Sequence, residues 1–478
     1  MNTRKMLRPL AVALIICALA LCIASCGSST ASQAPKPAPG SLKTAGKGYR
    51  FESNGWIYLH VEGSPNDRGF QNGKLMAPEM KRLIDAISFN MKNDMAAGWS
   101  GLTKGAQEVF MSKIDPEYLE EMRGISDGAK SAGVNLSLAD VVALNGYIEL
   151  KDYWYPTAEA GATGTPSGGC SAFVATGRYT ADGRPVMAHN TWNSYIEGQY
   201  FNVITDLKPD KGHRILMQSV PGAIGSTTDF FVTDAHIMGT ETTISGYSGF
   251  DPNGTPEFVR ARRAMQYAGS LDEFVSLMRK GNNGAYANSW LLANAASGEI
   301  MRFEQGLKHD AVEHTKSGYY VGSNGPTDTN IRNLESTRTG YLNVKDSVGA
   351  RRTRLETLMA QDRGAIDVAQ AKEIIGDHYD VYLHKDKPGD RTIEGRGDLD
   401  PDQYSSGTAY YPQGAVDGKV MDAREAMAMA FDARWGSASG LLFDAAQFLK
   451  LQPQFSYMRG ALKNRPTETW TLFNAGMK

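Results

Sequence analysis

The stretch Thr165-Pro166-Ser167-Gly168-Gly169-Cys170-Ser171-Ala172-Phe173-Val174 decides how this chain is organised. A flexible Gly/Ser/Pro segment ends there, and a run of strand-forming residues begins directly after Cys170. Gly168 and Gly169 carry no side chain, so the carbonyl of Gly169 is open to attack by the thiol of Cys170. We therefore predict that the Gly169–Cys170 bond cleaves itself and that Cys170 then heads a strand.

A hairpin follows from this first strand. Asp182-Gly183 is a typical two-residue turn, and residues 185–190 have the composition of the returning strand. A turn centred on Asp182-Gly183 places Cys170 opposite Tyr195, with residues 191–194 close by. We therefore expect the thiol to be held at the end of a rigid pair of strands.

Length and charge limit the classes of protein. The chain has 478 residues, of which 41% are hydrophobic and 21% charged, enough for a large buried core in one large domain or two ordinary ones. The formal net charge is −2 and no stripe of Lys and Arg is present. Nucleic acid demands a clustered basic excess, so we expect no nucleic-acid partner.

The first residues are typical of an export signal. Residues 1–8 are positively charged, and residues 10–23 form an apolar run that is short for a membrane span. Ile23-Ala24-Ser25-Cys26 resembles a bacterial lipobox, in which the signal is cut before a lipid-modified cysteine. We predict a signal peptide over 1–25 and a lipoprotein anchored through Cys26 in the bacterial cell envelope, on the periplasmic or outer side. The alternative is an ordinary signal peptide with an incidental Cys26.

The cysteine count singles out one thiol. Cys17 and Cys22 leave with the signal and Cys26 carries lipid, so the exported chain keeps Cys170 alone. A lone cysteine is more often a small buried hydrophobe, but the Gly-Gly-Cys-Ser context favours catalysis. Residues 26–48 are rich in Ser, Ala, Pro, Gly and Lys and are predicted to form a flexible tether.

Residue spacing predicts helices before Cys170 and again late in the chain. Apolar residues recur at helical spacing over 75–91, Asp115-Pro116 starts a second helix, and Ser137 with Asp140 suggests a capping box at a third. Short strand-like runs dominate the middle of the chain, and we expect another helix over 423–431. These patterns alone indicate a mixed α/β protein.

The motif His189-Asn190-Thr191-Trp192, downstream of Cys170-Ser171-Ala172, resembles a family signature. The chain resembles the N-terminal-nucleophile (Ntn) hydrolases, and within them it is similar to peptidase family C45 (acyl-CoA:6-aminopenicillanic acid acyltransferase-like) and to the phospholipase B-like proteins. Thr228-Asp229-Phe230-Phe231 and residues 283–290 add to the likeness, which spans roughly residues 55–305.

The resemblance implies an α+β fold, a four-layer αββα sandwich. Residues 49–169 would form the α segment and residues 170–478 the β segment of one domain, and the two chains would stay associated after self-cleavage. The implied enzyme is an N-terminal cysteine hydrolase or acyltransferase that cleaves a linear amide through a thioester. One alternative is a phospholipase B-like esterase or amidase acting on lipids; another is a non-catalytic binding lipoprotein with the same fold. The substrate would be a small or lipid-like acyl amide or ester.

Candidate site residues follow from this chemistry. An N-terminal cysteine carries a thiol nucleophile and an α-amine base on one residue. An acyl enzyme also needs donors to the oxyanion, and Asn288 falls on the asparagine of the Tyr-x-Asn segment that resembles the family. The alternative is that Asn288 has only a structural role in a turn. Asn190 and Asn193 are other candidate donors, and we take Asn193 as the second catalytic residue.

The motif after the second strand departs from the acylases, which place an aspartate there. This chain has Thr191-Trp192-Asn193 without an acid, which favours the phospholipase B-like side. We assign Trp192, Thr191 and His189 to substrate binding. Counting in register places His189 opposite Thr176, roughly 20 Å from Cys170 at about 3.3 Å per residue, so contact with the thiol would require a bulge.

Other chemical motifs are weak. A substrate-carboxylate clamp from Arg351, Arg352 and Arg354 competes with the usual solvated role of helix arginines. Residues 398–402 place three aspartates like a calcium loop, but Gln403 and Ala409 replace its glycine and closing glutamate, which favours a surface turn. No His-Glu-x-x-His, G-x-S-x-G or phosphate loop is present, and we expect no metal and no cofactor.

Overall fold

The computed structural model describes residues 37–38, 40–92, 95–158, 169–226, 229–337, 340–402 and 408–478. These residues belong to one compact unit, Ala34–Lys478. The predicted signal peptide, Cys26 and the segment 159–168 before the predicted cleavage bond lie outside the described residues. Among the helices that are described, none is both long and apolar enough to cross a membrane.

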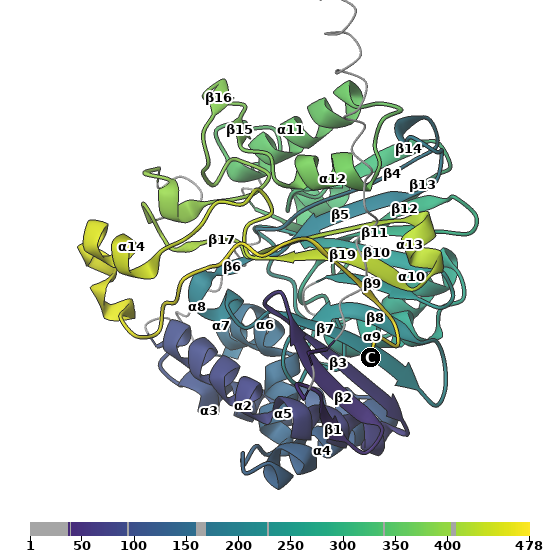
Figure 1. The fold of residues 1–478 in the computed structure, drawn as a ribbon, viewed down its shortest axis with the longest axis vertical. Helices are drawn as coiled ribbons and strands as arrows, with labels where there is room; N and C mark the ends of the chain where they lie inside the picture. Colours follow the sequence, from purple (N-terminus) through teal and green to yellow (C-terminus); the bar gives the residue numbers. More distant parts are fainter. Residues whose placement is uncertain are drawn as a thin grey trace, which may run out of the picture. The chain divides into compact units, whose positions relative to one another are not determined.

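A ten-stranded sheet forms one half of the fold (Figure 1). Neighbouring strands in this sheet are antiparallel, except for β3 and β7, which are parallel. In spatial order the strands are β1 (Lys43–Ala45), β2 (Gly48–Ser53), β3 (Trp56–Gly63), β7 (Val203–Pro209), β8 (Ile215–Ser219), β9 (Phe230–Thr233), β10 (Ile237–Thr243), β11 (Asn288–Asn294), β12 (Ile300–Gln305) and β13 (Asp310–Thr315). The segment 26–48, predicted to be a flexible tether, contains strand β1. This strand belongs to the sheet because it pairs with β2.

A six-stranded sheet carries the predicted nucleophile. Its order is β14 (Gly318–Gly322), β4 (Ser171–Thr176), β5 (Val186–Asn190), β18 (Asp417–Asp422), β19 (Ala430–Trp435) and β20 (Thr471–Asn474). Strand β4 also contacts β10 and β11 of the ten-stranded sheet. As predicted, Cys170 directly precedes a strand.

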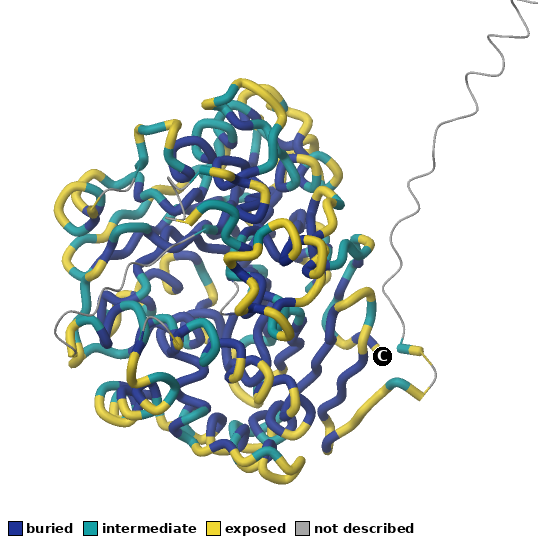
Figure 2. The backbone as a smooth tube through the Cα atoms, turned by 90° about the vertical axis from the view of Figure 1, so that its left-hand side faces the viewer, coloured by how far each residue is buried: buried dark blue, intermediate teal, exposed yellow. Residues whose placement is uncertain are grey.

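Helices cover both sheets. Helices α11 (Ser347–Gln361) and α12 (Val368–Ile375) pack on the six-stranded sheet, where Leu355 and Ile374 join Phe173 and Ala188 in one apolar cluster. The ten-stranded sheet contacts α2 (Pro65–Met91) and α10 (Leu271–Arg279). The remaining helices are α3 (Gly98–Gly105), α4 (Pro116–Ser131), α5 (Leu138–Asn145), α6 (Tyr147–Glu149), α7 (Tyr155–Ala158), α8 (Tyr195–Gly198), α9 (Glu257–Tyr267), α13 (Ala423–Met427) and α14 (Ala445–Leu451). The chain is therefore a mixed α+β protein, and Figure 2 shows its buried residues concentrated in the interior with exposed ones on the outer loops and turns.

The helices predicted before Cys170 are confirmed, with one difference in length. Helix α4 begins at Pro116, and α5 has the capping box between Ser137 and Asp140. Helix α2 starts at Pro65, earlier than the spacing predicts, because the side chain of Ser64 caps its first turn. The helix expected over 423–431 is wrong beyond Met427, since the following residues pair as β19 between β18 and β20.

The predicted hairpin register is also wrong. Ala172 pairs with His189 and Ser171 with Asn190, so Tyr195 does not lie opposite Cys170. The connection is longer than a two-residue turn: a 3-10 turn over Gly177–Tyr179 follows β4, and the Gly177 N–H donates to the Gly183 carbonyl at 3.1 Å. This shift moves His189 from the far end of the hairpin to the end that carries Cys170.

Candidate active site

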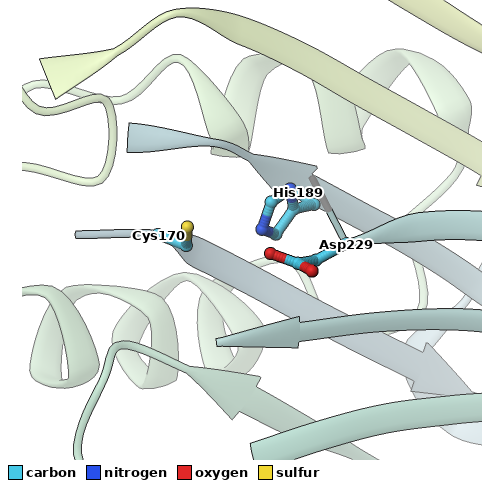
Figure 3. Close-up of side chains that lie close together, drawn as sticks. All are labelled: Cys170, His189 and Asp229. Carbon is cyan, nitrogen blue, oxygen red and sulfur yellow. The ribbon is translucent and has the colours of Figure 1, made fainter. Parts of the chain in front are cut away.

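Three side chains meet where β4 begins. The Cys170 sulfur, a ring nitrogen of His189 and a carboxylate oxygen of Asp229 all lie within 4.8 Å of one another. Figure 3 shows the His189 ring and the Asp229 carboxylate side by side, with the Cys170 thiol facing them. All three residues are buried. The predicted nucleophile therefore lies close to an imidazole and a carboxyl group, and no bulge is needed.

Burial sets the charge state of this cluster. It raises the pKa of the Cys170 thiol to about 12, with the Asp229 carboxylate adding to the effect. Burial, reinforced by the nearby Lys419 ammonium, holds the pKa of His189 well below its usual range. Among the described residues, neither ring nitrogen of His189 has a hydrogen-bond partner. In the uncleaved chain the thiol and the imidazole are thus both neutral at pH 7.

Asp229 belongs to a pair of buried carboxyl groups. Glu241, on β10, is completely buried, and burial together with the Asp229 charge raises its pKa well above the usual range. Two carboxyl groups buried close together are not both ionised at neutral pH, because their charges repel strongly away from water. Glu241 therefore keeps its proton, although neither of its carboxyl oxygens has a hydrogen-bond partner within the described residues.

Thr191 is held by a second buried polar network. The Lys419 ammonium, on β18, lies 2.6 Å from the Thr191 hydroxyl and 3.0 Å from an Asp417 carboxylate oxygen. The Thr191 N–H donates to Asp417 at 3.0 Å, and Gln218 contacts both charged groups. Lys419 pairs with His189 in the β18–β5 register, so this ion pair supports the strand end that carries the motif.

Arg351 lies inside the site and is not a solvated helix arginine. Its side chain is fully buried, and its guanidinium donates to the backbone carbonyl of Cys170. The same group lies 4.4 Å above the ring of Trp192 and donates to Asn324 at 2.9 Å. Burial lowers its pKa to about 10, so it remains a cation at neutral pH. Arg351 thus fixes the peptide that follows the predicted cleavage bond.

Trp192 packs against the predicted cleavage bond. Its indole N–H donates to the Asn190 side chain at 2.9 Å, which fixes the ring. A methyl group placed on Gly169 would lie 2.7 Å from a ring carbon, closer than real carbon contacts allow. Glycine at 169 is therefore required by the ring as well as by access to the carbonyl.

The two predicted oxyanion residues lie in different surroundings. Asn288 begins β11 and is 2% exposed, yet neither its side-chain oxygen nor its nitrogen has a hydrogen-bond partner within the described part of the chain. Asn193 lies in β6 (Trp192–Ser194), which pairs with β17 (Gln413–Ala415), and it is only partly buried. Of these two asparagines, Asn288 is thus the one that offers a fully buried donor without a partner among the described residues.

Sequence reasoning missed the roles of four groups near the thiol: Asp229, Glu241, Arg351 and Lys419. Asp229 lies in a segment that resembles the family, but that segment did not predict that Asp229 lies close to Cys170. Lys419 left no clear signal, because β18 reads Asp-Gly-Lys-Val-Met-Asp and its composition does not indicate a buried strand. Arg351 reaches the site only through the packing of α11.

The donors of the cluster also suit a metal ion. Thiolate, imidazole and carboxylate are the ligands that Zn²⁺ takes in proteins, and the three groups are close enough to share one ion. Such an ion would occupy the thiol and prevent it from acting as a nucleophile. The same geometry also matches a cysteine nucleophile with an adjacent base and an orienting carboxyl group.

Comparison with known proteins identifies the family. Residues 104–471, well over half of the chain, match the family model described as Phospholipase B, and the chain belongs to this family. The chain is 28% identical over 247 residues to an uncharacterized protein of Archaeoglobus fulgidus, covering 48% of this chain and 40% of that protein. It is 30% identical over 165 residues to putative phospholipase B-like 1 of Caenorhabditis elegans (33% and 28% covered) and 22% identical over 277 residues to phospholipase B-like protein C of Dictyostelium discoideum (48% of each). The matched part thus spans less than half the length of each of these relatives.

Proposed function

We propose that this chain is a self-activating acyl hydrolase in which Cys170 is the nucleophile and a lipid acyl ester or amide is the substrate. The observation that carries the proposal is the thiol of Cys170 within 4.8 Å of His189 and Asp229, at the start of β4. The family supports the lipid alternative over hydrolysis or transfer of a linear amide of another kind. The packing of helices on two contacting sheets supports the αββα arrangement of the Ntn hydrolases.

Self-cleavage is the first proposed step. The thiol attacks the Gly169 carbonyl, and its proton passes to the neutral His189. Asp229 faces the imidazolium that forms and stabilises it, as the carboxyl of a triad does. The Gly169–Cys170 C–N bond then breaks, the imidazolium gives the proton to the departing nitrogen, which becomes the α-amine of Cys170, and Gly169 is left as a thioester on the sulfur. Water then hydrolyses the thioester, which releases a carboxylate on Gly169 and the free thiol.

Turnover uses the same sulfur. The thiol attacks the acyl carbonyl of the substrate, the α-amine of Cys170 takes the proton and returns it to the leaving alcohol or amine, and water hydrolyses the acyl enzyme. The unpartnered amide of Asn288 is our proposed donor to the oxyanion. Arg351 holds the Cys170 carbonyl throughout. Attachment of the mature protein to a membrane through Cys26 remains a prediction.

A substrate panel tests this function. Purified wild type and Cys170→Ala are incubated with a lysophospholipid, a diacyl phospholipid and an N-acyl amide, and release of fatty acid is measured. We expect the wild type to hydrolyse a lipid ester or amide and the alanine variant to release nothing above background while melting within a few degrees of wild type. Equal activity of both proteins would exclude Cys170 as the nucleophile. Absence of lipid hydrolysis with turnover of a non-lipid amide would support the rival substrate class.

A further inference from the structure

A small buried cavity lies beside the Cys170 cluster. It has a volume of about 30 Å³, and its walls come from α5, α6, α9, the Gly225-Ser226 turn and Tyr286. Tyr286 links the cavity to the cluster, because burial raises the pKa of its hydroxyl well above the usual range and the nearby charges of Asp229, Glu241 and Cys170 add to the effect. A group bound in the cavity would therefore lie next to the residues that surround the thiol.

One carboxyl group on the cavity wall has no partner. Glu257, the first residue of α9, is 7% exposed, and its side chain forms no hydrogen bond or ion pair within the described residues. Burying a carboxyl group without a partner is costly, and such groups are rare unless they serve a ligand or a reaction. Burial and the charge of Glu149 raise the pKa of Glu257 well above its usual range, so this carboxyl is protonated while the cavity is empty and ionises only beside a bound cation.

Glu149 on the same wall shows that helix capping is not the explanation. Its two carboxylate oxygens accept from the N–H groups of Glu257 at 2.9 Å and Phe258 at 3.3 Å, and from the Asn283 side chain at 2.7 Å. Glu149 thus satisfies the start of α9. The nearest cation, Arg260, donates its own N–H groups to the Thr255 and Met278 carbonyls and to other side chains, so it does not neutralise Glu257 by contact.

The rest of the wall suits a cation. The rings of Tyr147, Phe258 and Tyr286 line the cavity, and aromatic rings attract positively charged groups. Glu257 and Glu149 place two carboxyl groups on the wall, and none of the residues that line the cavity is a Lys or an Arg. A volume of about 30 Å³ has room for a primary ammonium but not for a trimethylammonium group.

We propose that this cavity is a subsite for a primary ammonium group on the substrate, with Glu257 as its counter-ion. The inference rests on the proposed acyl hydrolase function and specifies its substrate class: acyl lipids that carry a free aminoalkyl group close to the scissile bond. Glu257 is then a specificity residue that contacts the substrate away from the reacting atoms.

Two matched substrates test the subsite. One carries an aminoethyl group and the other a hydroxyethyl group at the same place, and kcat/KM is measured for both. We expect the wild type to prefer the ammonium substrate at least tenfold, and Glu257→Gln to lose that preference while keeping kcat/KM for the neutral substrate. Glu273→Gln removes a glutamate from the first turn of α10, where it is exposed, and should leave the preference unchanged. An unchanged preference in Glu257→Gln, or an equal loss on both substrates, would overturn the proposal.

A binding measurement separates failure of the subsite from failure of the proposed enzyme. Ethylammonium chloride should raise the melting temperature of the wild type more than equimolar tetramethylammonium chloride does. The difference should vanish in Glu257→Gln and in Ala261→Val, which fills the cavity without changing its charge. If the wild type hydrolyses neither substrate but shows this difference, the acyl hydrolase assignment fails and the ammonium site stands. A wild type without the difference, or a Glu257→Gln variant that keeps it, would refute the site.

Discussion

Two groups of buried polar residues in this chain differ in whether their polar atoms have partners. Between α2, α4 and α9, the Arg68 guanidinium contacts Glu121 at 2.7 Å and Arg262 contacts the same carboxylate at 3.2 Å, so the buried charges are paired. The His189 ring, on β5, and the Asn288 amide, at the start of β11, are equally deep but lack hydrogen-bond partners within the described residues. Buried polar groups without partners are rare in native folds, so this difference supports the proposal that His189 and Asn288 serve a reaction.

The largest stability effect is expected in the paired cluster. Arg68→Met removes one partner of Glu121 and leaves a buried charge undercompensated, which typically costs about 3–5 kcal/mol of the free energy of unfolding. Arg82→Met, on the same helix, breaks a half-exposed pair with Glu79 and should cost less than about 1 kcal/mol. Urea unfolding of both variants checks the difference. Similar losses would show that the buried cluster does not stabilise the helices.

In the unpaired cluster we expect loss of rate without loss of stability. Asn288→Ala breaks no hydrogen bond within the described residues, but it removes the proposed oxyanion donor and should lower kcat by about a hundredfold or more. Asn294, at the other end of β11, accepts from the Ala296 and Ser297 N–H groups, so Asn294→Ala should lower the melting temperature and leave kcat intact. The reverse pattern would remove Asn288 from the site.

The buried carboxyl group of Glu241 should make the stability of the folded chain depend on pH. Glu241 ionises near its usual pKa of about 4.5 when the chain is unfolded, whereas its folded pKa is well above that value. The unfolded chain therefore loses this proton first, and the wild type loses about 1.4 kcal/mol of stability per pH unit between the two pKa values. Glutamine cannot ionise, so the stability of Glu241→Gln relative to wild type should grow as pH rises from 4.5. Denaturant midpoints across that range measure this change, and a constant difference would contradict the protonation of Glu241 in the folded chain.

The smallest expected effect concerns the residue before the predicted cleavage bond. Gly169→Ala places a methyl group against the Trp192 ring and should slow self-cleavage at least about tenfold, equivalent to about 1.4 kcal/mol on the barrier. Adding Trp192→Leu makes room for the methyl group and should restore part of the rate. Time courses on gels compare the two. Full-speed cleavage of Gly169→Ala would mean that the ring does not constrain this peptide.

Local signals in the sequence predicted local structure well. The Asp115-Pro116 start of α4, the capping box of Ser137 and Asp140, and a strand directly after Cys170 are all confirmed, because each depends on residues a few positions apart. The family resemblance could also be identified from the sequence, since the Cys170 motif and the His189 motif are each a short continuous stretch of the chain.

The rest of the site depends on contacts that sequence spacing does not contain. The tight turn at Asp182-Gly183 predicted the wrong register, and the correct register alone moves His189 next to Cys170. Arg351 reaches Cys170 across 181 positions in the chain, and Lys419 arrives because β18 pairs with β5. Pairing of distant strands and packing of a distant helix fix these positions, and neither leaves a periodic mark.

Cys170 itself is proposed to cleave the peptide bond that precedes it. Wild type and Cys170→Ala are purified identically, without added protease, and their chains are compared by intact mass and N-terminal sequencing. We predict that the wild type yields two associated chains, one ending at Gly169 and one beginning at Cys170, and that Cys170→Ala is a single folded chain. Cleavage of Cys170→Ala at the same bond, or a wild type that is active while intact, would contradict the account.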